Sequence, residues 1–365
     1  MFKIGFIGLG LIGGSLAKSI RRHYPETIIN AFDINSATLM EAHAEGVVNT
    51  MLHTVADFEQ QFQNCDYIFL CTPVESFPKF LPALKKVLTD HTILSDVGSV
   101  KSCVHKEMER YGLNKYFIGG HPMAGSEKSG YQSSTDILLE NAFFILTPTP
   151  ETSSEQLTAY SDFVQSIGAI PLQLVPAEHD RVVAAVSHLP HIIASSLVNL
   201  VSQEDTDEYM RKVAAGGFKD ITRIASSNSQ MWQNICMANQ YALLEMLDLF
   251  IEGLQKTRTK LADGNGDALF SFFATAKEYR DSIPNTSKGI IHKSFLLHCE
   301  LPDEAGGIAV VATILASKAI NIKNIGILNN RETESGALQI EFYDEDSLME
   351  AHKLLTKHHY IVECS

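Results

Sequence analysis

Cysteine and long apolar runs are both scarce in this sequence. Its six cysteines are scattered among 365 residues, with neither a CxxC pair nor the Cys and His spacing of a metal site. We therefore expect reduced cysteines, no bound metal and a cytoplasmic location. No stretch reaches the roughly 18 consecutive apolar residues of a membrane helix, so we predict that the chain does not span a membrane. The apolar stretch at residues 4–12 is broken by three glycines and lacks the cleavage site of a signal peptide.

Positive charge is also in short supply. The chain has 29 Lys and Arg against 43 Asp and Glu, which gives a formal net charge of −14. This balance argues against nucleic-acid binding through a broad basic surface. An anionic substrate would therefore need a local positive pocket. The hydrophobic content of 45% is ample for more than one buried core, and the length of the chain indicates two or three domains.

The first half of the chain alternates between strand and helix patterns. Short apolar runs typical of buried strands are separated by helical periodicity, as at residues 13–22 and 77–88. This alternation predicts βαβ units and a parallel sheet, in an α/β fold with a Rossmann-type dinucleotide-binding domain over residues 1–175. The predicted strands lie at residues 2–7, 27–32, 67–71, 92–96 and, at the far edge of the sheet, 143–147 and 171–175.

Two further domains are predicted after residue 175. Residues 176–283 are helical and apolar on more than one face in places, which is typical of helices buried in a bundle or against a partner. We predict an all-α substrate and dimerisation domain and a homodimer; the alternative is a monomeric helical core. A linker is expected at residues 281–293. Residues 294–365 follow the order strand, helix, strand, strand, helix, strand, which predicts a ferredoxin-like domain.

The segment at residues 8–13 has the G-x-G-x-x-G pattern between a predicted strand and a predicted helix. Its first glycine permits a tight turn, its second lets the backbone approach a pyrophosphate, and its third lets helix and strand pack closely. The N-terminus of the helix offers unpaired N–H groups to the phosphates. We predict that the segment binds a dinucleotide through Gly8, Gly10, Leu11, Ile12 and Gly13.

Asp33 follows the second predicted strand, at the distance expected for the acid of this motif. Its carboxylate would accept hydrogen bonds from the ribose hydroxyls and repel a 2′-phosphate, which favours NAD over NADP. Thr72 and Pro73 directly follow another predicted strand and are expected to line the same crevice. The alternative is a glycine turn in some other α/β fold, with Asp33 a solvated loop acid.

Four other clusters carry polar groups suited to chemistry. Residues 95–101 (SDVGSVK) follow a strand end, and residues 119–127 (GGHPMAGSE) are expected to form a glycine-rich loop around His121. Residues 187–191 (SHLPH) open a predicted helix. In residues 216–223 (GGFKDITR), a lysine and an arginine stand four residues apart, on one face of a predicted helix.

With these motifs in this order, residues 1–280 resemble the prephenate dehydrogenase family, whose relatives include arogenate and cyclohexadienyl dehydrogenases. The resemblance implies NAD-dependent oxidative decarboxylation of prephenate to 4-hydroxyphenylpyruvate, CO2 and NADH, in tyrosine biosynthesis. Residues 302–308 (PDEAGGI) fit the first strand-to-helix turn of an ACT domain. An amino-acid effector such as tyrosine is therefore expected there; the alternative is an ACT fold that serves only oligomerisation.

The resemblance also implies a role for individual residues. His121 would take the hydroxyl proton of the substrate as hydride leaves, a task that suits a neutral imidazole. Ser99 would hydrogen-bond His121 and lie near the nicotinamide. Arg223 is expected to bind the pyruvyl carboxylate through its planar fork, with help from Lys219 and His191. The alternatives are a structural loop histidine, a surface lysine and a helix-start histidine.

Other functions remain open on the sequence alone. A β-hydroxyacid dehydrogenase shares the glycine-rich start and a following all-α domain, and Lys219 could be mistaken for its catalytic lysine. Residues 119–125 and 188–191 are not expected in that class. An NAD-sensing regulatory protein with an amino-acid-binding tail would need none of these polar residues for catalysis. Arogenate carries an ammonium group that prephenate lacks, and spacing assigns no additional acid to it, so prephenate is preferred.

Overall fold

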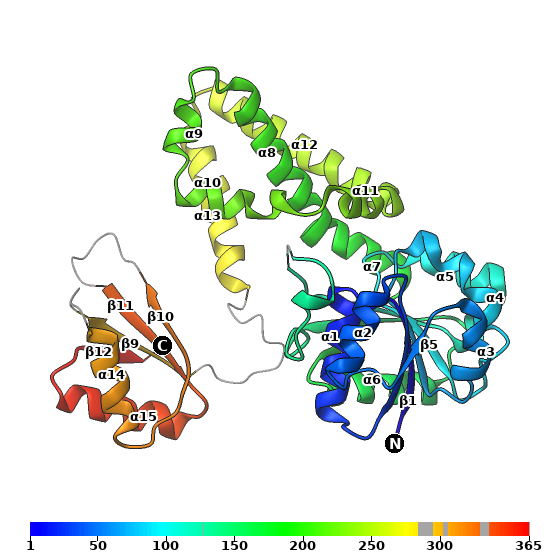
Figure 1. Cartoon of the computed structure of the whole chain (residues 1–365). Coiled ribbons are helices and arrows are strands. Elements are labelled where there is room, and N and C mark those ends of the chain that lie inside the picture. Colours follow the sequence, from blue (N-terminus) through cyan, green and yellow to red (C-terminus); the bar gives the residue numbers. More distant parts are fainter. Residues whose placement is uncertain (127, 284–294, 302–305, 329–335, 365) are drawn as a thin grey trace. The chain divides into compact units, whose positions relative to one another are not determined.

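The structure is a computed structural model that describes residues 1–126, 128–283, 295–301, 306–328 and 336–364. It divides into two compact units, Met1–Ser287 and Lys288–Ser365 (Figure 1). The first unit contains both the α/β region and the helical region that the sequence predicts.

A parallel sheet of five strands forms the centre of the α/β region. Its order, β3-β2-β1-β4-β5, is that of a Rossmann-type fold, as predicted. The strands read as nearly continuous apolar runs because both faces of the sheet are covered. They are β1 (Lys3–Ile7), β2 (Ile28–Phe32), β3 (Thr50–Leu52), β4 (Tyr67–Leu70) and β5 (Ile93–Asp96).

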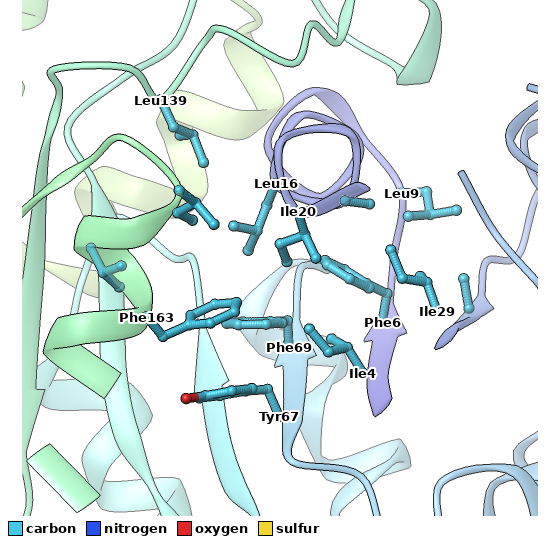
Figure 2. Packing of buried hydrophobic residues seen from close by; sticks show 14 of the residues in the cluster. Ile4, Phe6, Leu9, Leu16, Ile20, Ile29, Tyr67, Phe69, Leu139 and Phe163 are labelled. Atoms are coloured by element: carbon cyan, nitrogen blue, oxygen red, sulfur yellow. The ribbon is translucent and has the colours of Figure 1, made fainter. Parts of the chain in front are cut away.

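Two hydrophobic cores lie on opposite faces of this sheet, because successive side chains of a strand point to opposite sides. Phe69 joins the core with Leu16 and Phe163, which Figure 2 shows, whereas Leu70 joins the core with Met108. The covering helices are α1 (Leu11–His23), α2 (Ser36–Ala44), α3 (Phe58–Gln61), α4 (Leu81–Leu84), α5 (Ser102–Tyr111) and α6 (Ser154–Ser166).

The prediction of a helix over residues 77–88 is wrong in its extent. A 3-10 turn (Val74–Lys79) precedes the short helix α4. Pro78 and Pro82 explain the difference, because proline lacks the N–H that a continuous helix requires.

The strands predicted at the far edge form a sheet of their own. In it, β7 (Phe143–Pro148) lies between β6 (Ile118–Pro122) and β8 (Ile170–Gln173). A parallel bridge between Leu94 and Phe117 joins the start of β6 to β5.

The prediction of a loop at residues 119–122 is wrong, because these residues belong to β6. The glycines there serve close packing rather than a turn. A Cβ on Gly120 would lie 2.6 Å from the backbone oxygen of Asp96. Only glycine lets the two strands approach so closely.

The helical region begins with one long helix made of three parts. A π-helical turn (Ala184–His188) connects α7 (Pro176–Val183) to α8 (Leu189–Glu204). Helix α8 begins at Leu189, within the predicted segment 187–191, but the π-helical turn makes it continuous with α7. Pro190 cannot donate to the preceding turn, and the irregular turn lies directly before it. The remaining helices are α9 (Tyr209–Val213), α10 (Gly216–Thr222), α11 (Ser229–Ala238), α12 (Gln240–Ala262) and α13 (Gly266–Ser282).

This continuous helix also corrects the prediction that no segment could span a membrane. Among the described residues, Pro176–Glu204 is long and apolar enough to do so by length and composition. This helix was not predicted as one segment, because residues 187–191 were expected to begin a new helix. Length and composition are weak evidence for a membrane span, since core helices of globular proteins pass the same test. This helix carries His179 and Asp180, which hydrogen-bond to residues of the α/β region.

The second unit has the predicted order of strands and helices. Its antiparallel sheet has the order β10-β11-β9-β12. Leu297, Val311, Ile340 and Leu355 are among the buried residues of its core. The elements are β9 (Phe295–Leu301), α14 (Gly307–Ala316), β10 (Ile322–Leu328), β11 (Gly336–Phe342), α15 (Glu345–Lys357) and β12 (Val362–Cys364). Most of the segment 302–308, and most of the predicted linker 281–293, lie outside the described residues.

Candidate active site

The turn after β1 has the geometry of a dinucleotide-binding loop. Gly8 has a φ of 100°, a value that favours glycine, and a Cβ there would lie 2.8 Å from the backbone oxygen of Cys71. A Cβ on Gly13 would lie 2.5 Å from the backbone oxygen of Gly8, so this glycine lets α1 pack against β1. Gly10 differs, because a Cβ there would meet no atom within 4 Å. The space beside Gly10 is open to a ligand.

The N-terminus of α1 is open as well. Gly10 precedes the helix without a capping side chain, so the first N–H groups, from Leu11 onward, keep their donor capacity. The carboxylate of Asp33 accepts hydrogen bonds from the backbone N–H of Leu9 (2.7 Å) and Asn35 (2.8 Å). These bonds hold Asp33 beside the turn and leave acceptor capacity for ribose hydroxyls. The residues present therefore fit a dinucleotide such as NAD.

The turn after β4 lies against the same glycines. A Cβ on Gly8 would lie 2.8 Å from Cγ2 of Thr72. The hydroxyl of Thr72 is 2.8 Å from Oγ of Ser76, and Pro73 directly precedes the 3-10 turn. Thr72 therefore lies beside the glycine turn, where it was expected.

Strand register brings His121 to this edge of the sheet. Ile7 of β1 pairs with Leu70 of β4, and Leu70 pairs with Asp96 of β5. The backbone N–H of Gly120 donates to the Asp96 carboxylate at 3.2 Å. The glycine turn after Ile7 and the side chain of His121 both lie at the carboxyl ends of strands, where such sheets bind their ligands.

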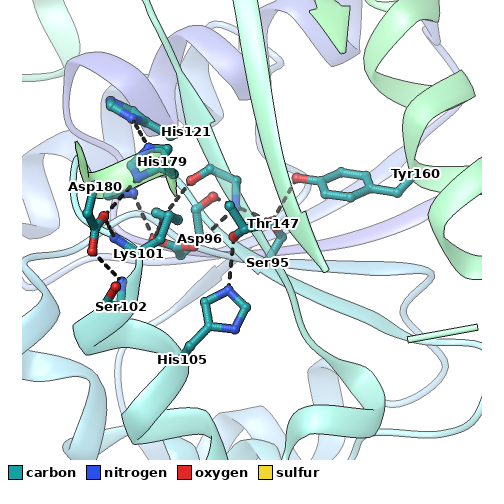
Figure 3. Close-up of polar contacts among 12 residues, drawn as sticks. Ser95, Asp96, Lys101, Ser102, His105, His121, Thr147, Tyr160, His179 and Asp180 are labelled. Carbon is teal, nitrogen blue, oxygen red and sulfur yellow. Dashed lines mark hydrogen bonds and ion pairs between the residues drawn. The ribbon is translucent and has the colours of Figure 1, made fainter. Parts of the chain in front are cut away.

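His121 is 8% exposed and belongs to a row of three polar side chains. Its Nδ1 is 2.8 Å from Nε2 of His179, and Nδ1 of His179 is 2.8 Å from Oδ1 of Asp180. Figure 3 shows the row, which leads from β6 to the first half of α7. Two imidazoles and a carboxylate in this order can hold a proton at a defined atom.

Asp180 is anchored by the start of α5. Its carboxylate accepts hydrogen bonds from the backbone N–H groups of Lys101 (2.7 Å) and Ser102 (2.8 Å). The ammonium group of Lys101 is fully buried; it pairs with Asp96 and donates to the backbone oxygen of Gly120 at 2.7 Å. The segment 95–101 therefore connects β5, β6 and α7 beneath the site.

Burial governs the protonation of the row. It holds the pKa of His121 well below the ordinary value, helped by the neighbouring His179, Lys101 and His188. Burial also lowers the pKa of His179, although the hydrogen bond to Asp180 opposes it. For Asp180, burial raises the pKa, but hydrogen bonds from His179 and Ser102 outweigh it and keep the pKa below its usual value. Both imidazoles are neutral and the carboxylate is ionised near neutral pH.

Ser99 is half-buried in the turn before α5. Nδ1 of His121 contacts His179, and among the described residues no hydrogen bond joins Ser99 to His121. The expected bond between Ser99 and His121 therefore stays a prediction.

The histidines of residues 187–191 have different surroundings. Nδ1 of His188 is 3.1 Å from Nδ2 of Asn239, an amide that also donates to the backbone oxygen of Asp180 at 2.8 Å. Burial lowers the pKa of His188 to about 4. The ring of His191 stacks on Trp232, with ring centroids 3.5 Å apart. His188 thus belongs to the buried network, and His191 lies at its half-buried margin.

Lys219 and Arg223 are exposed on the helical region. Lys219 belongs to α10, which ends before Arg223, where a 3-10 turn (Arg223–Ser226) begins. Both elements contact α8, the helix that carries His191. The two cations therefore lie on elements that pack against the helix that carries His191.

Sequence reasoning missed His179, Asp180 and Asn239. Residues 178–180 (EHD) place titratable side chains near a helix start, which was the available signal. Nothing in the spacing links His179 to His121, which is 58 positions earlier. Only the packing of α7 against α5 and β7 brings them together.

Comparisons with known proteins agree with this geometry. Residues 16–171 match the prephenate dehydrogenase nucleotide-binding domain, and residues 175–275 match the prephenate dehydrogenase dimerization domain. The prephenate dehydrogenase of Bacillus subtilis is 36% identical over 95% of this chain and 94% of its own length. That of Lactococcus lactis is 33% identical over 98% of each chain.

A solved structure is similar as well. Prephenate dehydrogenase from Aquifex aeolicus, in complex with hydroxyphenyl propionate and NAD+, has a TM-score of 0.73 at 33% identity. The match covers 78% of this chain and 99% of that chain. This chain belongs to the prephenate dehydrogenase family.

Proposed function

We propose that this chain catalyses the NAD-dependent oxidative decarboxylation of prephenate to 4-hydroxyphenylpyruvate, CO2 and NADH, a step of tyrosine biosynthesis. The position of His121 carries the proposal: a buried, neutral imidazole lies at the sheet edge where the glycine turn opens. Oxidation of a hydroxyl needs a proton acceptor near the hydride acceptor, and a neutral imidazole suits that task. Relatives named prephenate dehydrogenase, which match nearly the whole chain, support it.

NAD, when bound, supplies the hydride acceptor. Nε2 of His121 takes the ring hydroxyl proton as hydride leaves the carbon that bears this hydroxyl. The bond from the ring to its carboxylate then breaks, and its electron pair makes the ring aromatic while CO2 leaves. The proton returns to the phenolic oxygen, so His121 ends the cycle neutral.

The remaining site residues have proposed roles in binding. Arg223 would bind the pyruvyl carboxylate, because a guanidinium matches a carboxylate with two hydrogen bonds. Lys219 and His191 would help to hold the substrate from α10 and α8. Ser99 would hydrogen-bond His121 and lie near the nicotinamide. Asp33 would select NAD by repelling the 2′-phosphate of NADP.

The activity is tested by supplying prephenate, arogenate and small β-hydroxy acids in parallel and following NADH absorbance. We expect the largest kcat/KM with prephenate and NAD. A preference for arogenate would move the substrate assignment within the family. Turnover of β-hydroxy acids alone would overturn the proposal and make Lys219 the candidate catalytic residue.

We also propose that the helical region forms a homodimer in the cytoplasm. Helices α12 and α13 leave large apolar side chains exposed in the single chain, among them Leu254 (54%), Phe270 (76%), Phe273 (66%) and Tyr279 (72%). An apolar surface of this kind marks an interface, and the matched family model for this region describes a dimerization domain. A second copy, rather than a membrane, would cover it. Light scattering of the purified chain without detergent tests both points.

For the second unit we propose a ferredoxin-like ACT domain that binds an amino acid such as tyrosine and lowers activity. The strand order β10-β11-β9-β12 with helices between strands supports the fold. Calorimetry with tyrosine on the full chain, and on a chain ending at Ser287, tests the effector. Binding that persists undiminished without the second unit would count against this site.

A further inference from the structure

We propose that His179 and Asp180 are positioning residues that hold His121 in the one neutral tautomer able to act as the base. The inference rests on the proposed function, because it explains how the base of that reaction is prepared. It is carried by the hydrogen-bonded row of the three side chains in Figure 3.

The direction of the row is set by Asp180. Its two oxygens accept hydrogen bonds from the backbone N–H groups of Lys101 (2.7 Å) and Ser102 (2.8 Å), at the start of α5. These donors favour the ionised carboxylate, which can only accept. Nδ1 of His179, 2.8 Å from Oδ1 of Asp180, must therefore carry a proton and donate it.

This donor fixes the next hydrogen bond. A neutral imidazole carries one proton, so His179 with a proton on Nδ1 has a lone pair on Nε2. Nδ1 of His121, 2.8 Å from that lone pair, must then be the donor. The lone pair of neutral His121 is left on Nε2, which is the atom that the reaction needs as proton acceptor.

Burial strengthens the preference of His121 for this tautomer. His179 is 0% exposed and Asp180 is 4% exposed, so water cannot readily replace either partner. In the other tautomer of His121, two lone pairs would face each other across 2.8 Å. Such an unsatisfied contact is costly in a buried site.

The row also provides for the charge that forms in the reaction. When His121 takes a proton, the carboxylate of Asp180 lies behind it, beyond His179, and stabilises the cation. The buried cation of Lys101 pairs with Asp96, which leaves Asp180 available for this task. Among the described residues, the titratable and charged groups near His121 come from β5, the start of α5, α7 and the π-helical turn. They are Asp96, Lys101, His179, Asp180 and His188.

Kinetics with the full chain test the proposal, after turnover of prephenate by the wild-type protein has been established. A wild type without activity refutes the proposed function and leaves the tautomer to the measurement below. For Asp180→Asn and His179→Phe we expect kcat to fall on the order of 10- to 100-fold with little change in either KM. For Asp180→Asn, the acid limb of kcat/KM should also move to lower pH, because the cationic form of His121 loses the carboxylate behind it.

His105→Phe is the matched control. His105 is also a buried histidine, hydrogen-bonded to Thr147 at 2.9 Å, but it lies outside the row. Its replacement should leave kcat and the pH profile unchanged. If it lowers kcat as much as Asp180→Asn does, the effect is general destabilisation and the positioning role is wrong.

A direct measurement does not depend on the activity of the variants. Side-chain ¹⁵N spectra of the wild-type chain with NAD, labelled at histidine, show which ring nitrogen carries the proton, and His121→Asn identifies the signal. We expect the proton of His121 on Nδ1. A proton on Nε2, or a folded Asp180→Asn variant with wild-type kcat, would overturn the proposal.

Discussion

Nε2 of His179 and Nδ1 of His121 are 2.8 Å apart, although the two residues belong to different regions of the first unit. His121 belongs to β6, and His179 belongs to α7, the first helix of the helical region. Asp180 binds the start of α5 through two backbone N–H groups and strengthens this connection. The side chain that we propose as the base is therefore held by both regions. Changes in α7 should affect catalysis, even though α7 carries no residue that we assign to substrate binding.

The role of His121 is tested by His121→Asn. We expect kcat to fall about 100- to 10,000-fold, the usual contribution of a general base. The dissociation constant for NAD should not change, because the glycine turn belongs to β1 and α1. Calorimetry with NAD serves as the control, and full activity in this variant would show that another group is the base.

Alanine substitutions at Gly13 and Gly10 should differ in their effect on stability. Gly13→Ala should lower the free energy of unfolding by about 1–3 kcal/mol, because its Cβ would lie 2.5 Å from a backbone oxygen. Gly10→Ala should change it by less than about 1 kcal/mol, because its Cβ would meet no atom within 4 Å.

For NAD binding, the larger effect is expected from Gly10→Ala rather than from Gly13→Ala. Gly10→Ala should weaken NAD binding about tenfold or more, because the methyl group would take the space of the pyrophosphate. Chemical denaturation and NAD titration of both variants separate the two effects. Equal NAD affinity in Gly10→Ala and wild type would mean that the pyrophosphate does not approach this residue.

Much of this site could be predicted from local patterns. The glycine turn, Asp33 and Thr72 each follow a strand that the local pattern predicts, and the structure places them around one turn. His121 was identified by its motif, but its strand was not. Glycines usually indicate turns, whereas Gly120 is needed here because β5 and β6 approach closely.

The supporting network could not be predicted in the same way. The partner of His121 depends on the packing of α7 against α5 and β7, which no periodicity encodes. The π-helical turn before Pro190 also joins two helices that the sequence pattern separates. As a result, a helix of membrane-spanning length was overlooked.

Stability should fall at mildly acidic pH. Burial lowers the pKa of His105 and of His188 to about 4. In the unfolded chain, the pKa of each of these groups is about 6.5. Between these values the unfolded chain binds protons that the folded chain does not, so the free energy of unfolding falls as pH falls.

This pH dependence can be measured by urea denaturation at about pH 7 and pH 5. The midpoint should be higher at the higher pH, and His105→Phe should reduce the difference by removing one titrating group. Equal midpoints at both values would contradict burial of these histidines in the neutral form.

The proposed dimer predicts the effect of charge on α13. Phe270 and Phe273 are 76% and 66% exposed in the single chain. The double variant Phe270→Glu, Phe273→Glu should change the mass measured by light scattering from dimer to monomer, because buried unpaired carboxylates are costly. The matched control is Ile34→Glu, a residue of the α/β region that is 90% exposed. A double variant that remains dimeric would exclude this surface as the interface.

The stoichiometry of the reaction tests the proposed activity most directly. The full chain is incubated with prephenate and NAD, and NADH, CO2 and 4-hydroxyphenylpyruvate are each quantified. We expect equal amounts of all three products from the wild-type chain and, over the same incubation time, about 100-fold less or lower with His121→Asn. NADH without matching CO2, or no NADH from the wild-type chain, would contradict the proposed activity.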